Sequence, residues 1–183
     1  MVSATMTVEP CFHEEWFSDF NQQVLIWLAG QVTDVDGLII EIGCWEGRST
    51  VCLANAINPR LVQAVDTWEG SGHEISAQLA AERDVFAQWS ANVEAFTNGN
   101  VVPHWMGWRE YLPTVTDPVA LAFIDAEHSF TEVFDNLQAV LPMLASGGIV
   151  CGDDSHPPPV QSAVLALLPD ANVKGAVWWW KKP

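Results

Sequence analysis

The stretch EIGCWEGRST, residues 41–50, is central to how this chain is expected to fold. The apolar residues 38–40 precede it, and a short apolar run of this kind indicates a buried strand. The residues after the second glycine read as a helix, so Gly43 and Gly47 lie between a strand and a helix. Glycines there permit unusual backbone angles and close approach of a ligand, which the first N–H groups of the helix can face. The alternative is a tight turn in which the glycines serve only chain reversal.

Strand and helix patterns alternate along the chain. The signals include Asn58-Pro59, which ends one helix, and the pair Ser129 and Glu132, which is placed as a capping box before another. Strands are predicted at residues 38–42, 61–65, 101–105, 119–124 and 149–151 and near the C-terminus, and helices at about 13–29, 48–57, 74–96, 130–144 and 160–168. This alternation favours an α/β fold: a doubly wound, mostly parallel sheet with helices on both faces.

One domain is predicted to span residues 1–183, since the length suits a single domain and no linker or repeat interrupts the chain. Residues 1–37 are expected to form an N-terminal helical segment, and residues 38–183 the core that binds a cofactor. No stretch reads as a signal peptide or a membrane span, so a cytoplasmic location is predicted. The four cysteines form no Cys-x-x-Cys pair or zinc spacing and are expected to be reduced thiols: Cys11, Cys44, Cys52 and Cys151.

The charge balance excludes some partners. The chain has 7 basic and 23 acidic residues, a net charge of −16, which would repel a phosphate backbone and an anionic membrane. We therefore expect no nucleic-acid or membrane partner. A cationic ligand would be attracted instead.

Asp66 closes the second predicted strand, 19 residues after Gly47. An acid at this place in a strand-helix-strand unit is suited to binding the diol of a ribose. A lone aspartate could instead cap Trp68 or the following turn. In combination with the glycine turn, Asp66 favours a nucleoside ligand.

Two nucleoside cofactors, NAD and S-adenosylmethionine (SAM), are bound through a ribose-binding acid on such a sheet. The Gly-x-Gly-x-x-Gly pattern of dinucleotide sites is absent because residues 44–46 are Cys-Trp-Glu, so a pyrophosphate would meet side chains where it needs bare backbone. Glu41 would oppose a pyrophosphate but could anchor an ammonium group. The turn suits a zwitterion with an extra positive charge, and an NAD-dependent oxidoreductase is the poorer alternative.

Acidic residues follow two later strands: Asp125 ends one, and Asp153 and Asp154 end the next. If these strands are neighbours, three carboxylates converge at the carboxyl edge of the sheet and repel one another unless a cation or a proton intervenes. All-oxygen ligands indicate a hard cation, Mg²⁺. The alternative is that Asp125 caps the next helix and the other two begin a polar loop.

His128 lies just beyond Asp125 and has three open roles: a general base, a metal neighbour, or a helix-entry residue bonded to backbone. His156 and Glu127 lie close to the same acids without an assigned role. Several tryptophans lie at strand ends or in the loops after them, where any could line an adenine pocket, although core filling explains most tryptophans: Trp45, Trp68, Trp105 and Trp108.

Five segments together carry a family pattern: EIGCWEGRST, AVDTWEGS, GWREYLP, FIDAEHSF and SGGIVCGDD. They resemble the class I SAM-dependent methyltransferases, and among them the metal-dependent macrocin O-methyltransferase group, which acts on sugars of natural products. The resemblance spans about residues 38–168. It implies a seven-stranded Rossmann-like fold, SAM as methyl donor, and Mg²⁺-dependent methylation of a hydroxyl on a sugar or small natural product.

The resemblance also implies roles for single residues. Around the methionine part of SAM it places Glu41, Gly43, Ser49 and Thr50, at the ribose Asp66, and beside adenine Gly107 and Trp108. Gly47 and Trp68 join this predicted cofactor site from their places in the two turns. The Mg²⁺ triad would be Asp125, Asp153 and Asp154, with Asp125 also the candidate base and His128 a second catalytic candidate.

Two features depart from the family pattern. DAE stands at residues 125–127 where relatives commonly have Asp-Gly-Asp, and the N-terminal lid segments of the macrolide and aminocoumarin enzymes have little room before residue 38. The sequence therefore does not determine the methyl acceptor, how the site is closed from water, or whether the protein is a homo-oligomer. Two further hypotheses are a methyltransferase whose aspartates bind no metal, and a nucleoside-binding module without transfer activity.

Overall fold

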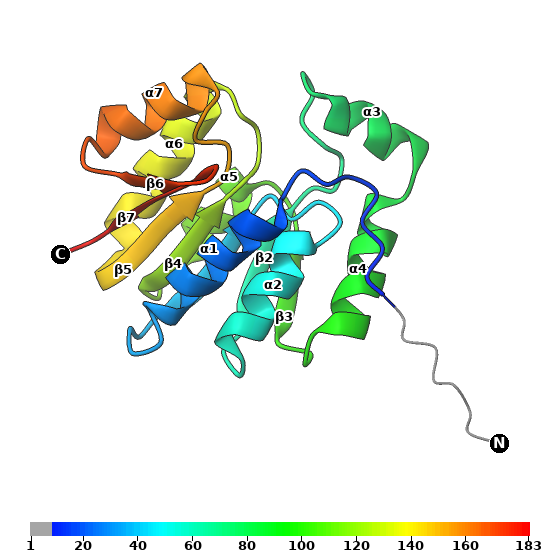
Figure 1. Cartoon of the computed structure of the whole chain (residues 1–183), viewed down its shortest axis with the longest axis horizontal. Helices are drawn as coiled ribbons and strands as arrows, with labels where there is room; N and C mark the ends of the chain where they lie inside the picture. Colours follow the sequence, from blue (N-terminus) through cyan, green and yellow to red (C-terminus); the bar gives the residue numbers. More distant parts are fainter. Residues whose placement is uncertain (1–8) are drawn as a thin grey trace.

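A twisted sheet forms the centre of the molecule, whose computed structural model describes residues 9–183 (Figure 1). Its strand order is β3-β2-β1-β4-β5-β7-β6. β1 to β5 run parallel to one another, and the order of the chain reverses between β1 and β4. The strands are β1 (Leu38–Ile42), β2 (Val62–Asp66), β3 (Val101–Trp105), β4 (Val119–Ile124), β5 (Leu144–Gly152), β6 (Asn172–Lys174) and β7 (Val177–Lys181).

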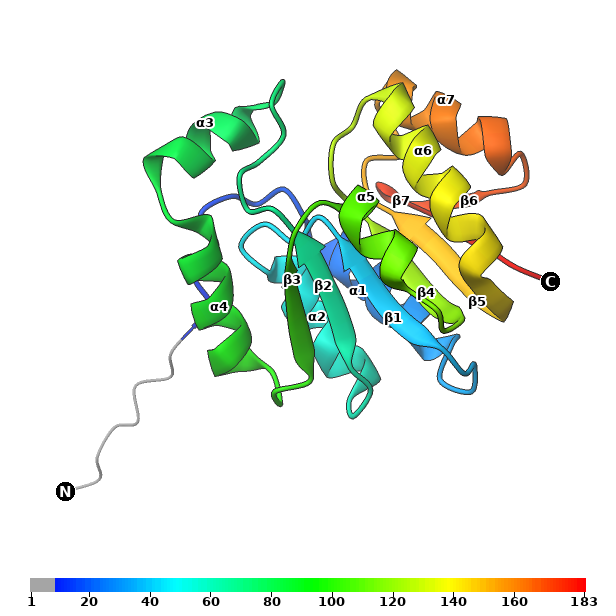
Figure 2. The same cartoon turned by 180° about the vertical axis from the view of Figure 1, so that it is seen from behind.

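Helices cover both faces of the sheet. α1, α2 and α4 lie on one face (Figure 1), and α5, α6 and α7 lie on the other (Figure 2). The helices are α1 (Asp19–Gly30), α2 (Arg48–Ile57), α3 (Ile75–Glu82), α4 (Val85–Phe96), α5 (Trp108–Tyr111), α6 (Phe130–Val140) and α7 (Pro158–Leu167), and 3₁₀ turns are at Leu112–Thr114 and Leu141–Met143. The predicted doubly wound α/β fold is confirmed.

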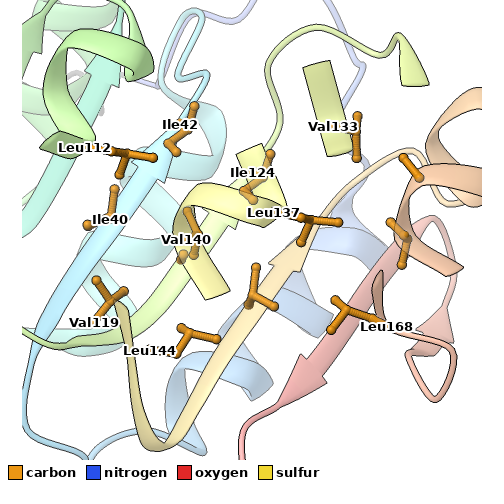
Figure 3. Close-up of a cluster of buried hydrophobic side chains, with 14 of the residues drawn as sticks. Ile40, Ile42, Leu112, Val119, Ile124, Val133, Leu137, Val140, Leu144 and Leu168 are labelled. Carbon is orange, nitrogen blue, oxygen red and sulfur yellow. The ribbon is translucent and has the colours of Figure 1, made fainter. Parts of the chain in front are cut away.

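Successive residues of β1 supply the cores of both faces. Ile39 belongs to the buried cluster under α1 and α2, with Leu25 and Leu53. Ile40 and Ile42 belong to the cluster under α6 and α7 (Figure 3). Because strand side chains alternate between the faces, a central parallel strand covered on both sides needs this continuous apolar sequence.

The C-terminal end of the sheet is antiparallel. The predicted C-terminal strand is a hairpin of β6 and β7, and β7 runs antiparallel to both β5 and β6. Gly175, with φ +64°, lies in the hairpin turn. The buried Trp178 donates its Nε1–H to the Asp153 carbonyl oxygen at 3.0 Å, so the hairpin supports the loop after β5.

The N-terminal helix is shorter than predicted. α1 begins at Asp19 instead of near residue 13, because the Ser18 side chain caps it by accepting a hydrogen bond from the Asn21 N–H. Residues 9–18 form no helix, so the prediction of an N-terminal helical segment over 1–37 holds only for α1, and residues 1–8 lie outside the described part.

Two other predicted helices have different bounds. The helix predicted at 74–96 is interrupted between α3 and α4, where the Asp84 side chain caps α4 by accepting from the Ala87 N–H. The helix predicted at 130–144 ends at Val140, since Pro142 lies in a 3₁₀ turn that leads directly into β5. Over residues 9–183, none of the helices is long and apolar enough to cross a bilayer.

Candidate active site

A cavity of about 350 Å³ opens at the carboxyl ends of β1, β2, β4 and β5. It lies where the strand order reverses, the usual ligand position of an open α/β sheet. Among its walls are five of the nine residues predicted to bind the cofactor: Gly43, Ser49, Asp66, Gly107 and Trp108. All predicted catalytic and metal residues also line it: Asp125, His128, Asp153 and Asp154. The other four predicted cofactor residues lie behind the wall: Glu41, Gly47, Thr50 and Trp68.

Gly43 allows the turn after β1 to touch the turn after β4. Its φ is +87°, and a Cβ atom there would lie 2.2 Å from the Asp125 carbonyl oxygen. Its N–H donates to the Val65 carbonyl at 3.0 Å. No larger residue fits without moving the Asp125 backbone. The cavity wall is therefore bare backbone at this point, as close approach of a ligand requires.

Gly47 has a packing role. Its φ is +89°, it precedes α2, and a Cβ atom there would lie 2.9 Å from Cδ1 of Trp89. The glycine thus lets α2 begin close against α4. Gly47 was predicted to let the helix begin near the strand with its N–H groups facing the ligand, and the glycine itself lies outside the cavity wall.

Asp66 points its carboxylate at the glycine turn. Oδ2 accepts from the backbone N–H of Cys44 (2.6 Å) and Trp45 (2.9 Å), and Oδ1 accepts from that of Trp68 (2.7 Å). Burial raises the pKa of Asp66, while these N–H groups oppose the rise. Asp66 lines the cavity at the end of β2, where its carboxylate can face a ribose hydroxyl.

Glu41 and Thr50 support the wall from behind. Glu41 is fully buried, and its Oε1 accepts from Ser49 Oγ at 2.6 Å. Its Oε2 has no hydrogen-bond partner among residues 9–183. Burial raises the pKa of Glu41 to about 7; the Ser49 bond opposes the rise and Asp125 adds to it. Thr50 accepts from Trp89 Nε1 at 3.2 Å, so only Ser49 of this group reaches the cavity.

The two tryptophans predicted to join the cofactor site, Trp68 and Trp108, differ in position. Trp108 lines the cavity, and its Nε1 donates to Glu132 Oε2 at 3.2 Å. Trp68 is buried, with its ring centroid 4.7–5.8 Å from those of Phe86, Trp89 and Trp105. Trp108 can therefore contact a ligand, and Trp68 fills the core between β2 and α4.

His128 lies among three carboxylates. Its Nδ1 is 2.9 Å from Glu74 Oε1, and its Nε2 is 2.9 Å from Asp154 Oδ2 and 3.6 Å from Asp125 Oδ1. Burial alone would lower the pKa of His128, but the three carboxylates raise it to about 12. A protonated imidazole is a counter-charge and accepts no proton, so Asp125 is the better candidate base. Sequence reasoning had not assigned Glu74 to the site.

Donor atoms of Asp125, His128 and Asp154 lie within 4.8 Å of one another, a spacing that suits a metal ion. The predicted triad had Asp153 in place of His128. Asp153 accepts from Asn21 Nδ2 at 3.0 and 3.3 Å, and burial and the Asp125 charge raise its pKa to about 7. Asp153 lines the cavity, but its oxygens are not among the donor atoms that lie within 4.8 Å of one another.

Residues 10–17, here termed the N-terminal strap, cross the glycine turn and were not predicted to join the site (Figure 1). Glu46 anchors the strap although it is only 2% exposed: it accepts from the His13 N–H at 2.7 Å and lies 2.9 Å from Arg83 Nη2. Four strap residues line the cavity: Phe12, Glu14, Trp16 and Phe17. The strap thus occupies the place that a lid would take.

A buried amide holds the other end of the strap. Asn92 accepts from the Cys11 N–H at 3.0 Å and donates to the carbonyls of Cys11 and Glu46, both at 2.9 Å. Trp16 packs against Trp45 with ring centroids 5.3 Å apart and ring planes tilted by 36°. The burial of Glu46, which requires a cation and a covering segment, follows from the fold and is not visible in the sequence.

A family model described as a methyltransferase domain matches residues 40–155. The chain belongs to this methyltransferase family. It is a SAM-dependent methyltransferase, as predicted, and the matched range contains the glycine turn and the predicted aspartates. A search among curated proteins returned no significant match for the methyltransferase.

Solved structures share the fold of the methyltransferase. The O-methyltransferase NovP superposes with a TM-score of 0.66 at 19% identity, covering 88% of this chain and 78% of NovP. CalS11, a TDP-rhamnose 3′-O-methyltransferase of calicheamicin biosynthesis, gives 0.63 at 20% identity, covering 96% and 88%. TomG from Streptomyces achromogenes, an O-methyltransferase involved in tomaymycin synthesis and solved with SAM, gives 0.60 at 18% identity, covering 88% and 80%.

Proposed function

We propose that this methyltransferase transfers the methyl group of SAM to a hydroxyl oxygen of a sugar or small natural product, with Mg²⁺ held by Asp125, Asp153 and Asp154. One observation carries the proposal. A single cavity joins a half suited to a nucleoside, with Asp66 and Trp108, to a half with Asp125. The O-methyltransferase activity of NovP, CalS11 and TomG supports it.

The proposed reaction is a direct displacement. The acceptor oxygen forms a bond to the methyl carbon, the bond from sulfur to that carbon breaks, and S-adenosylhomocysteine (SAH) leaves as a neutral thioether. The hydroxyl proton goes to a base, for which we propose the Asp125 carboxylate. Asp125 is suited to this because burial raises its pKa, and Gly43 fixes its backbone against the cofactor turn. Binding both reactants in one cavity supplies proximity.

The acid cluster fits a divalent cation. Asp125 and Asp154 already lie close enough to share one, and Asp153 is the third candidate ligand. A bound Mg²⁺ would lower the pKa of the acceptor hydroxyl. The residues' own contribution is to bring carboxylate oxygens to the end of the cavity opposite Asp66.

A metal-independent methyltransferase is the second candidate, and the position of His128 favours it. The imidazolium lies 2.9 Å from Asp154 and offsets charge in the place where a metal would bind. In this version Asp125 alone accepts the proton.

Calorimetric titration tests the proposal. After chelator treatment, the protein is titrated with SAM, SAH and NAD, each with and without Mg²⁺. Micromolar binding of the two sulfur nucleosides with NAD silent is expected; silence from both would leave only the fold assignment. Transfer of labelled methyl to hydroxylated acceptors follows, using Asp153→Asn and, as control, the exposed Asp170→Asn. If Asp153→Asn loses activity and Mg²⁺ dependence while Asp170→Asn keeps both, the metal-dependent version is supported.

We also propose that residues 1–183 act as one catalytic domain in the cytoplasm, with a small-molecule acceptor and no nucleic-acid or membrane partner. Gel filtration coupled to light scattering distinguishes a monomer from a homo-oligomer. Cell fractionation tests the location.

A further inference from the structure

The walls of the cavity are strongly acidic. Nine carboxylates line it: Glu14, Glu46, Asp66, Glu74, Asp125, Glu127, Glu132, Asp153 and Asp154. They come from the strap, from the turns after β1, β2, β4 and β5, and from α6. A low-dielectric cleft lined by one sign of charge concentrates ligands of the opposite sign.

Most basic side chains are engaged elsewhere. The chain has seven lysines and arginines, all within the described residues. Arg60 and Lys182 donate to backbone carbonyls near the amino ends of β1 and β5. Arg83 pairs with Glu14 and Glu46, and Arg109 pairs with Glu132 and Asp135. The remaining two lysines are on the C-terminal hairpin, outside the cavity wall.

Arg48 is the one arginine in the cavity wall. It is the first residue of α2, its guanidinium lies 4.8 Å over the Phe12 ring, and its buried Nε has no hydrogen-bond partner in the described chain. Helix N-termini and guanidinium groups both bind carboxylates. The carboxylate of the cofactor's methionine part is the anion that this end of the cavity would receive.

Few positive charges are left for an acceptor. Arg83 and Arg109 pair with Glu14, Glu46 and Glu132, and Arg48 lies over the Phe12 ring. Four carboxylates line the cavity at the carboxyl ends of β4 and β5: Asp125, Glu127, Asp153 and Asp154. Among the described residues that line the cavity, no lysine or arginine lies at these two strand ends.

We infer that the acceptor is a hydroxyl compound that carries a protonated amine, and that phosphorylated or nucleotide-linked sugars are rejected. The inference rests on the proposed function, whose transfer site it specifies. It separates this chain from CalS11, whose substrate is a TDP-sugar. A pyrophosphate would enter an acidic half-cavity without an arginine to bind it, at a cost in affinity.

Paramagnetic probes of matched size test the inference without knowledge of the acceptor. The ¹⁵N-labelled protein, saturated with SAH and Mg²⁺, is mixed in turn with amino-, hydroxy- and phosphonooxy-TEMPO. Broadening of the Glu127 and His128 amide signals measures how much of each probe gathers at the acceptor half. The Asp36 amide, in an acidic turn at the other end of β1, reports the general attraction of an acidic protein for cations.

The expected result is broadening of the Glu127 and His128 signals about threefold or more stronger with the amine than with the neutral probe, and weakest with the phosphate. This preference should exceed that at Asp36. It should fall in Glu127→Gln, which removes a cavity charge, and persist in the exposed control Asp34→Asn. Equal broadening by the three probes, or a preference for the phosphate, overturns the inference. If SAH still binds in that case, the proposed function stands. Absence of SAH binding overturns both.

Discussion

Nε2 of His128 lies 2.9 Å from Oδ2 of Asp154, and Nδ1 of the same ring lies 2.9 Å from Glu74. One imidazolium thus joins the turns after β4 and β5 to the segment before α3. Because Asp154 is also a proposed metal ligand, a bound cation and His128 would offset the same negative charge. The stability of these loops should therefore depend on metal once His128 is removed.

His128→Gln should lower the free energy of unfolding of the metal-free protein by about 1–2 kcal/mol, because three partly exposed carboxylates lose their shared counter-charge. Mg²⁺ should restore more stability to this variant than it adds to the parent protein. Urea unfolding with chelator and with Mg²⁺ measures both effects. His73→Gln, an exposed histidine, is the control. An equal response of parent and His128→Gln to Mg²⁺ would mean that the cation binds elsewhere.

The buried Glu41 predicts a fall in stability with rising pH. Its pKa in the folded protein is about 7, above its ordinary value of 4.5, because of burial and the nearby Asp125. Between pH 4.5 and about 7, the folded protein therefore keeps a proton on Glu41 that the unfolded chain has released. This contribution is complete below pH 4.5 and is lost as the pH rises through 7, a change of roughly 3 kcal/mol.

Glu41→Gln removes this titration. Urea unfolding of parent and variant at a series of pH values should give curves that diverge across that range, with the parent losing stability relative to the variant as the pH rises. Parallel curves would show that Glu41 is ionised in the folded protein. Cys44 and Ser49, which adjoin the carboxyl, are unchanged in this comparison.

The strands could be predicted because their signal is local. The bounds of β1, β3 and β4 agree with the predicted 38–42, 101–105 and 119–124, since buried strands are apolar runs closed by turns. The break between α3 and α4 could not be predicted in this way. It depends on the Asp84 side chain capping α4 and on Arg83 pairing with Glu46, which is distant in sequence. Helix periodicity carries no trace of either contact.

The sequence could place those residues of the candidate site that lie at the ends of strands. Asp66 and Asp125 could be placed from strand ends alone, because parallel strands present these ends at one edge. The strap was missed, since residues 10–17 are irregular and their partners, such as Asn92 for Cys11, are far away in sequence. The same reason explains Glu74, whose part in the site depends on the fold bringing it to His128.

Gly43→Ala should destabilise the protein by about 3 kcal/mol or more and abolish SAH binding, because the new Cβ meets the Asp125 backbone. Gly99→Ala is the matched control: its φ is +72°, but no atom lies within 4 Å of the added Cβ within the described part of the chain. It should cost about 1 kcal/mol and leave SAH binding intact. Thermal unfolding and calorimetry measure the two effects. Equal costs would show that the contact between the two turns is unimportant.

Trp16→Ala should weaken SAH binding about 3–10-fold, because the strap loses its ring contact with Trp45 and the cavity loses an aromatic wall. Trp27→Ala provides a control of the same chemistry: Trp16 and Trp27 are 49% and 48% exposed, and Trp27 contacts Trp179 with centroids 5.5 Å apart. Calorimetry should show unchanged SAH affinity in Trp27→Ala. If both variants bind SAH like the parent, the strap does not contact the cofactor.

Arg48→Met should weaken SAH binding roughly 10–100-fold, because a charge-assisted bond to the cofactor carboxylate is lost. The affinity for methylthioadenosine, which lacks the amino-acid part, should not change. Arg60→Met, which removes donors to the Val32 and Gly37 carbonyls, should lower stability without changing affinity for either nucleoside. Calorimetric titration of the three proteins with both nucleosides separates these cases. An equal loss of affinity for SAH and methylthioadenosine would mean that Arg48 does not bind the cofactor carboxylate and only maintains the shape of the turn. The Arg48 guanidinium would then remain available to an anionic acceptor.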